Sequence, residues 1–457
     1  MFDREAKARN ALDRHATYFA QVLEQHASRL HGANQKAALN EMTVEFDNIR
    51  AAWNWALERE NAGWLAAMLE CLLGYADKRG HVLEMLNLFQ RGHQRISGGW
   101  RVFAPELCHR LRAGHGELLL RLGRNNEAKP LLEAALGELE RLGSASAWRV
   151  SLIHAQLLLN LGELNRAKAE AQTVIDAAKP VSHHLRTDAL RLKGAILAQQ
   201  GEYQTAIALL EQARSEYEQM GDRLECADTL IQLSVAWYNG GDKNADQIYA
   251  AMEQALEIQR EFDDHQGIVA TLSNIGYVHD LRDEFDEARS AYHESLSLAT
   301  RYGLNKEILR NQFRMAGLEQ SLGQLERAYA QFEVCVAQAK IQHNHWILVR
   351  SIGTLGEIAL ELERFDVARE HFRESIRMAW DASETPTVLT LLEIVAGLEA
   401  RSDPIWAQQL ALLVTQHPAA QSRDRDSAQL LLERLQLVST QPIQTISLEA
   451  VVERLLE

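Results

Sequence analysis

Small residues recur along most of the chain at a near-constant interval of about forty, and this interval constrains the fold more than any other feature. The anchors are Gly116, Ala155, Gly194, Ser234, Gly276, Ala316, Gly356 and Ala396, with steps of 39, 39, 40, 42, 40, 40 and 40 residues. Each anchor lies in the middle of a segment whose apolar residues recur at helical spacing. Such a period indicates a stack of similar supersecondary units rather than one closed globular core.

A turn position follows seven residues after each anchor, and a second small residue often follows after twelve. The turn positions are Gly123, Gly162, Gly201, Gly241, Asp283, Gly323, Glu363 and Asp403. Alanine fills the later position at Ala128, Ala167, Ala206, Ala288, Ala328 and Ala368. Small residues let two helices cross closely, and a left-handed residue ends the first helix. Each unit is therefore predicted to be a helical hairpin. The fourth unit, with an apparent two-residue insertion after Gly241, and the eighth, shifted by one at Ala407, are degenerate.

The order of small residue, turn, aromatic residue and two alanines resembles the tetratricopeptide repeat. One unit shows it as Gly194, Gly201, Tyr203, Ala206 and Ala213. The resemblance covers about residues 106–415 and implies an all-α fold, a right-handed superhelical solenoid of about eight such hairpins. The step near 40 exceeds the repeat's usual length of about 34 residues, so HEAT-like repeats are the structural alternative. The spacing inside each unit favours the tetratricopeptide interpretation.

The two ends of the chain lack the repeat. Residues 1–105 are predicted to form a helical N-terminal segment, and residues 416–457 a C-terminal helical cap. The stretches RHATYFAQ and EFDNIRAAWNWAL resemble the segment after the winged helix of STAND regulators, large signal-transducing ATPases of the LuxR and AfsR type. In that family the segment leads into a long tetratricopeptide-like sensor arm.

The resemblance to STAND regulators implies a sensor or interaction module that controls autoinhibition or assembly of a signalling or transcription regulator. The chain contains no G-x-x-x-x-G-K-[ST] phosphate loop and no basic helix-turn-helix. We therefore expect either a sensor arm, with an ATPase module in cis upstream, or a stand-alone tetratricopeptide adaptor that joins proteins.

Charge and composition argue against several partners and compartments. Lys and Arg total 48 against 63 for Asp and Glu, and the net charge of -15 gives no long-range attraction for nucleic acid or anionic lipid. No stretch approaches the ~18 consecutive apolar residues of a membrane span, and the start MFDREAKARN is charged where a signal peptide would become apolar. The scattered cysteines Cys71, Cys108, Cys226 and Cys335 form no C-x-x-C pair, as expected of a cytoplasmic chain.

Neither a metal site nor a cofactor is predicted from the histidines or the acidic residues. The pairs His183/His184 and His343/His345 lack the spacing of three or four that favours one metal on a helix. The first pair is expected in an inter-repeat loop after Lys179-Pro180. The acidic run from His279 to Glu287 lacks the order of a calcium loop and is predicted to be a helix end, a turn and a helix start.

Catalysis is not predicted either. The motif G-x-S-x-G is absent, and we expect no enzyme, with a hidden active site in residues 1–105 or at the C-terminus as the alternative. Trp53 and Trp55, two apart on a predicted helix, face opposite sides. Core packing is favoured for both over contact with a partner or neighbouring domain.

The first helix of each hairpin is expected to line the concave surface of the solenoid. Positions three before and one, four or five after each anchor face that surface, and two arginines lie one turn earlier. The candidate ligand-binding residues are Gln156, Asn160, Arg191, Gln199, Tyr238, Asn239, Ser273, Tyr277, Arg310, Phe313, Gln320, Arg350 and Glu357. Rings stack while amides and guanidinium groups fix orientation, so the predicted occupant is a protein or peptide segment or a small-molecule inducer. Plain solvated helix positions are the alternative.

Overall fold

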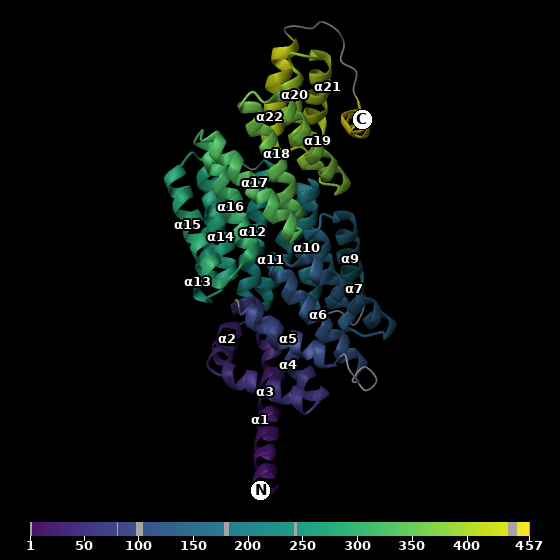
Figure 1. Ribbon diagram of the computed structural model, residues 1–457, viewed down its shortest axis with the longest axis vertical. Coiled ribbons are helices and arrows are strands. Elements are labelled where there is room, and N and C mark those ends of the chain that lie inside the picture. The colour runs from purple at the N-terminus through teal and green to yellow at the C-terminus, as the bar shows by residue number, and fades with distance from the viewer. Residues whose placement is uncertain are drawn as a thin grey trace.

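The computed structural model describes the chain over residues 2–79, 81–96, 104–177, 182–241, 245–436 and 446–456. Within these ranges the chain forms twenty-three α-helices and no strand (Figure 1). Consecutive helices pack against each other from the first helix to the twenty-second. The predicted all-α solenoid of tetratricopeptide-like hairpins is confirmed.

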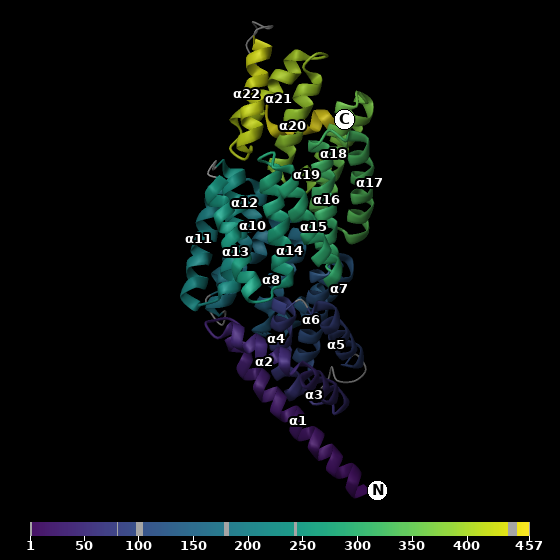
Figure 2. The ribbon, with the colours of Figure 1, turned by 90° about the vertical axis from the view of Figure 1, so that its left-hand side faces the viewer.

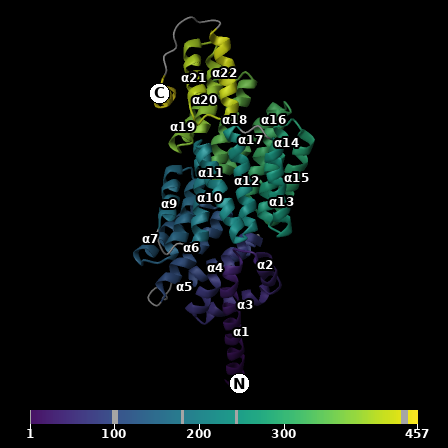
Figure 3. The same cartoon turned by 180° about the vertical axis from the view of Figure 1, so that it is seen from behind.

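Sixteen of the helices pair into eight hairpins, one for each predicted repeat. Their bounds are α6 Pro105–Arg121 and α7 Asn125–Arg141; α8 Ser146–Asn160 and α9 Leu164–Asp176; α10 His183–Gln200 and α11 Tyr203–Met220; α12 Arg223–Gly240 and α13 Ala245–Glu261; α14 His265–Asp280 and α15 Phe285–Tyr302; α16 Asn305–Ser321 and α17 Leu325–Gln342; α18 His345–Glu361 and α19 Phe365–Asp381; α20 Thr385–Glu399 and α21 Pro404–Gln416. Seen from behind, the hairpin of α12 and α13 lies beside the hairpin of α10 and α11 (Figure 3).

Seven further helices flank the hairpins. Five precede them: α1 Phe2–Arg29, α2 Gln35–Val44, α3 Phe46–Glu58, α4 Ala62–Arg79 and α5 Val82–Ile96. Two follow them: α22 Ser422–Gln436 and α23 Leu448–Leu456. The N-terminal half of α1 extends beyond the rest of the molecule, whereas α23 lies beside α19 (Figures 1 and 2).

The anchors act as the sequence predicts. A Cβ added to Gly276 would lie 2.7 Å from the ring of Tyr292, and one added to Gly356 would lie 2.7 Å from the ring of Phe372. The bulky partner follows sixteen residues later in both hairpins, so the two helices cross where the first has no side chain. The alanines of the second helix, Ala206 among them, are fully buried.

Seven of the eight predicted turn positions have a left-handed backbone. Gly201 has a φ of 86°, and even the non-glycine residues Asp283 and Glu363 have a φ of 59°. The eighth prediction is wrong, because Asp403 has a φ of -139° and instead caps α21, accepting a hydrogen bond from the Trp406 amide. The expected insertion after Gly241 lies at residues outside those that the structure describes.

The solenoid winds so tightly that hairpins far apart in sequence touch one another. The Asn125 side chain donates to the carbonyl of His343 at 3.1 Å, across 218 residues. The Gln199 side chain donates to Glu384 Oε1 at 3.1 Å, across 185 residues. The turns that follow α6, α8 and α10 therefore pack against the region where α16, α18 and α20 begin.

The N-terminal helices continue this packing. Arg79, at the end of α4, donates to Asp263 at 2.8 Å in the turn before α14. Trp53 is fully buried against Phe89, with ring centroids 5.2 Å apart, and its cluster of buried side chains runs on into the first hairpins. Trp55 donates to Asp13 Oδ1 at 2.9 Å and so packs on α1. Core packing accounts for both tryptophans. No helix among those described is long and apolar enough to cross a membrane.

Candidate functional site

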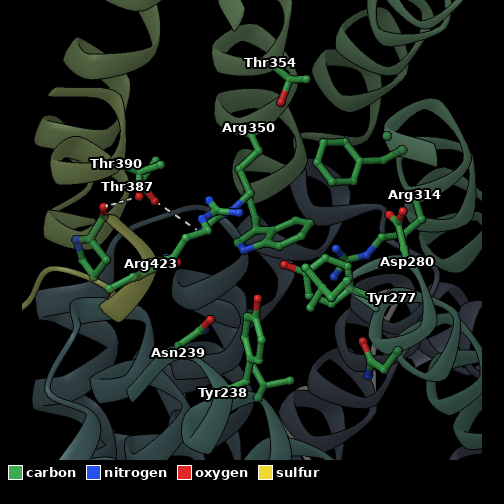
Figure 4. Close-up of a pocket in the computed structure, with 18 of the residues that line it drawn as sticks. Tyr238, Asn239, Tyr277, Asp280, Arg314, Arg350, Thr354, Thr387, Thr390 and Arg423 are labelled. Atoms are coloured by element: carbon green, nitrogen blue, oxygen red, sulfur yellow. Dashed lines mark hydrogen bonds between the residues drawn. The ribbon is translucent and has the colours of Figure 1, made fainter. Parts of the chain in front are cut away.

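The first helices of the later hairpins enclose a cavity of about 540 Å³, which we call the aromatic cavity. Helices α10, α12, α14, α16, α18 and α20 line it, and the start of α22 closes one side. Its rings include Tyr238, Tyr277, Phe313 and Trp346, and its cations are Arg314, Arg350 and Arg423. Figure 4 shows the three arginines arranged around the tyrosines. The first helix of each of these hairpins can face the cavity because its small anchor packs closely against the second helix on the opposite side.

Arg350 and Arg423 each form an ion pair, whereas Arg314 only lies near enough to Asp280 to oppose the rise that burial causes in the pKa of that carboxyl. The Arg314 guanidinium carbon lies 3.8 Å from the centroid of the Tyr277 ring and 6.0 Å from that of Trp346. Among the described residues it forms no ion pair within 4.0 Å, and its buried Nε has no hydrogen-bond partner. Stacking orients a guanidinium without consuming its donors, so Arg314 is placed to receive an anionic group.

Arg350 is held in place by an ion pair, a hydrogen bond and a ring contact. Arg350 pairs with Glu384 at 3.3 Å and donates to Thr387 Oγ1 at 3.2 Å. Its guanidinium carbon lies 4.4 Å from the Trp346 ring centroid. Glu384 also accepts from Gln199, so this network joins α10, α18 and α20. Arg350 therefore shapes the cavity more than it offers free charge.

Burial makes the acidic groups of the aromatic cavity harder to ionise. Burial raises the pKa of Glu357 to about 7, although Arg423 and Gln320 pull it down. Burial also raises the pKa of Asp280. Because these carboxyls ionise reluctantly, the arginines dominate the charge of the aromatic cavity.

A second cavity, of about 520 Å³, is lined by α4, α6 and α8 and by the starts of α10, α12, α14 and α16, and we call it the charged cavity. Ion pairs fill much of it: Arg149 contacts Glu117 at 2.9 Å, and Lys78 contacts Glu225 at 2.9 Å. Lys306 has no carboxylate within 4.0 Å among the described residues, and burial beside Arg310 lowers its pKa. The charged cavity is thus lined by both signs of charge.

Two carboxyls of the charged cavity are also hard to ionise. Burial and the neighbouring Glu225 raise the pKa of Asp228 to about 7, against the pull of Arg191. Burial, with a further contribution from Asp228, raises the pKa of Asp264 well above its usual range.

The thirteen residues predicted to line one concave wall divide between the two cavities. Eight line the aromatic cavity: Gln199, Tyr238, Asn239, Tyr277, Phe313, Gln320, Arg350 and Glu357. Four line the charged cavity: Gln156, Asn160, Arg191 and Arg310. Ser273 lines neither, because it lies on α14 between Ala270 of one cavity and Asn274 of the other, and its side chain is fully buried.

Sequence reasoning missed Arg314, Trp346 and Arg423. Arg314 lies two residues before its anchor and Trp346 ten before, outside the positions that the register selected. Arg423 comes from α22, beyond the last hairpin, so no repeat register could place it. The alternation of Arg and aromatic residues along α16 and α18 was the available signal.

The expected loop position of His183 and His184 is wrong. His183 is the first residue of α10 rather than part of a loop, because Ser182 caps that helix by accepting from the Leu185 amide at 3.2 Å. Lys179-Pro180 lies outside the described residues. His343 has a left-handed φ of 50° in the turn after α17, and His345 begins α18. The acidic run forms the end of α14, a turn at Asp283 and the start of α15, as predicted.

Comparisons with known proteins support the fold. The sequence matches no known family description. It also matches no curated protein sequence. A crystal structure of a Rap protein complexed with competence and sporulation factor is similar, with a TM-score of 0.50, 15% identity and coverage of 76% of this chain and 99% of that chain.

Two other solved structures are similar at lower scores. The apo form of the quorum sensor NprR from B. thuringiensis has a TM-score of 0.48 and 14% identity, covering 83% of this chain and 99% of that chain. A STAND protein with a tetratricopeptide repeat sensor from Pyrococcus horikoshii has a TM-score of 0.41 and 14% identity, covering 90% of this chain and 54% of that chain.

Proposed function

We propose that the chain is a non-catalytic sensor or interaction module that binds a peptide segment or small molecule in the aromatic cavity. The observation that carries this proposal is Arg314, stacked on Tyr277 with no ion pair among the described residues. The cavity's volume of about 540 Å³ lies in the usual range for ligand sites, ~300–1,000 Å³. A similar fold in a Rap protein complexed with competence and sporulation factor adds support for a partner-binding role.

The chemistry of the aromatic cavity defines the ligand class. Tyr238, Tyr277 and Trp346 offer faces for apolar or planar groups, and Arg314 offers a charge for a carboxylate. A short peptide with a free carboxyl terminus, or with an acidic side chain beside an apolar one, satisfies both. The occupant would shift a signalling equilibrium only by binding one form of the protein more tightly than another.

A peptide-binding comparison tests this proposal. A pool of short synthetic peptides with free carboxyl termini is compared with the same peptides amidated, by their effect on the melting temperature. We expect some peptides with a free carboxyl terminus to raise the melting temperature. Their affinity should fall at least tenfold in Arg314→Met and in Tyr277→Ala, while the helical content of both variants stays unchanged. Tyr238→Ala should weaken binding of the same peptides.

A matched control uses Arg301, which contacts the ring of Tyr302 at 5.7 Å on the outer helix α15. Arg301→Met removes the same charge and the same kind of stacking away from the cavity, so it should bind like the wild type. The proposal would be contradicted if both arginine variants lost the same amount of peptide affinity, or if neither variant lost any.

We also propose that the module belongs to a STAND-type regulator, on the strength of the EFDNIRAAWNWAL resemblance. An ATPase and a winged helix encoded in frame before Met1 would support this context. A native start of translation at Met1 would contradict it and leave a free-standing adaptor.

A further inference from the structure

Two histidines and one aspartate from three separate elements meet at the edge of the charged cavity. They are His31, in the turn after α1, His184, in the first turn of α10, and Asp222, directly before α12. Their nearest nitrogen and oxygen atoms all lie within 4.8 Å of one another. His184 Nε2 is 3.0 Å from Asp222 Oδ2, and His31 Nδ1 is 3.6 Å from the same oxygen.

The two separations to Asp222 match those of a metal ligand set. Zinc is bound at ~2.0–2.1 Å by histidine nitrogen and carboxylate oxygen, and tetrahedral geometry then places neighbouring ligand atoms about 3.3 Å apart. The observed 3.0 and 3.6 Å bracket that value. Small side-chain movements would therefore suffice to admit an ion. His31 and His184 both line the charged cavity, which leaves a fourth position open to water or a ligand.

Outer contacts orient two of the three ligands. His184 Nδ1 lies 3.2 Å from Asp188 Oδ2, and Tyr217 donates to the other Asp188 oxygen at 2.6 Å. Histidine ligands in metal sites characteristically donate their second nitrogen to a carboxylate in this way. Asp222 Oδ1 accepts from Gln35 at 2.8 Å and from the Glu225 amide at 3.3 Å, so Oδ2 is the oxygen left for an ion.

The fold fixes the backbone beneath the cluster. A Cβ added to Gly221 would lie 3.0 Å from the Ala33 nitrogen, and one added to Gly32 would lie 3.3 Å from the Met220 carbonyl. The turn after α1 and the turn before α12 are thus in direct contact. This contact sets His31 beside Asp222, and the ring centroids of His31 and His184 are 4.2 Å apart.

The surrounding charge is compatible with a cation. Lys78 lies 4.0 Å from Asp222, but on Oδ1 and not on Oδ2, and its closer partner is Glu225 at 2.9 Å. Arg191 also pairs with Glu225, at 3.1 Å. The second carboxylate Asp188 stands behind His184. Lys78 and Arg191 are therefore both paired with Glu225. His184 lies between two carboxylates, those of Asp188 and Asp222.

We propose that His31, His184 and Asp222 form a zinc site that clamps the N-terminal helices to the repeat solenoid. Borderline metals such as Zn²⁺ favour imidazole and carboxylate ligands together. A bound ion would link α1, α10 and α12 and stabilise the folded chain, since the three ligands meet only after folding. The site is independent of the aromatic cavity.

Calorimetric titration of Zn²⁺ into untagged, chelator-treated full-length protein tests the site. We expect one ion per chain and a rise in melting temperature. His31→Ala should weaken binding at least tenfold, and it should fold, since the His31 side chain is 41% exposed. His184→Ala should do the same.

The control is His183→Ala, which alters the neighbouring residue outside the cluster. The His183 side chain is 60% exposed and points to Glu216, 3.8 Å away. It should bind Zn²⁺ like the wild type and show the same rise in melting temperature. No uptake by the wild type, or equal uptake by all three variants, would overturn the proposal. Co²⁺ provides a second readout, because a visible absorption band lost in His31→Ala reports the histidine ligands directly.

Discussion

Burial, rather than any charged neighbour, sets the protonation of Glu357. Its side chain lies on α18 in the aromatic cavity, and burial raises its pKa to about 7 despite Arg423. The folded state therefore holds this proton at a pH at which the unfolded chain has lost it. As the pH rises from the ordinary glutamate pKa toward 7, Glu357 makes the folded state progressively less stable relative to the unfolded state.

Glu357→Gln should remove this pH dependence. The difference in unfolding free energy between Glu357→Gln and the wild type should shift in favour of the variant by roughly 2 kcal/mol between about pH 5 and about pH 8. Urea denaturation at both pH values measures it. Glu370→Gln, on the exposed face of α19, serves as control and should show no such shift. A difference that is flat with pH would mean that Glu357 is ionised in the fold.

At the residue scale, the sequence predicted which side chains line a cavity better than which side chains lie together in space. Tyr238, Tyr277 and Arg350 were found from the register, and they do line a cavity. Asp222 was not found, because its neighbours His31 and His184 lie 191 and 38 residues away in sequence, and only the superhelical winding brings them together. Patterns of nearby residues carry no information on such contacts.

At the scale of the element, the hairpin was predictable because each unit repeats the same close crossing. Gly194 and Ala206 show the reason: a Cβ added to Gly194 would lie 3.3 Å from the Ala206 carbonyl and 2.8 Å from Leu210. Gly194 and Ala206 must therefore both be small, and Leu210 fills the space beside Gly194. The eighth hairpin deviated because Pro404 begins α21 directly after Asp403, whose side chain caps the helix in place of a left-handed turn.

Ala206→Leu should test this crossing. Ala206 is fully buried on α11, so a larger side chain must push α10 away, at a cost of ~1–3 kcal/mol. The melting temperature should fall accordingly. Ala208→Leu places the same side chain on the exposed face of α11 and should leave the melting temperature nearly unchanged. A silent Ala206→Leu would show that the repeat register is misassigned.

At the scale of the whole molecule, hairpins of successive superhelical windings contact one another, and we call this contact closure. Local hairpin contacts alone would let an array of eight units flex like a spring. Here the turn after α10 packs on α20 and on the segment before α22, and the turn after α6 packs on the segment after α17. Both cavities are bounded by helices from distant hairpins, so this closure sets their shape.

Substitution of Gly201 should separate closure from local turn strain. Gly201 has a φ of 86°, and a Cβ there would lie 2.7 Å from the Ala419 side chain and 2.8 Å from Pro386. Gly323 has a φ of 74° and nothing within 4 Å of an added Cβ. Gly201→Ala and Gly323→Ala therefore share a left-handed backbone cost of ~1–2 kcal/mol, but only the first also pushes two windings apart.

The difference in unfolding free energy between the two variants measures how much the contact between windings contributes to stability. Gly201→Ala should lose at least about 1 kcal/mol more unfolding free energy than Gly323→Ala, since the clash cannot be relieved by rotating a flexible side chain. Small-angle scattering should also show a larger radius of gyration for Gly201→Ala alone. If both variants unfold and scatter alike, the windings do not hold each other in solution.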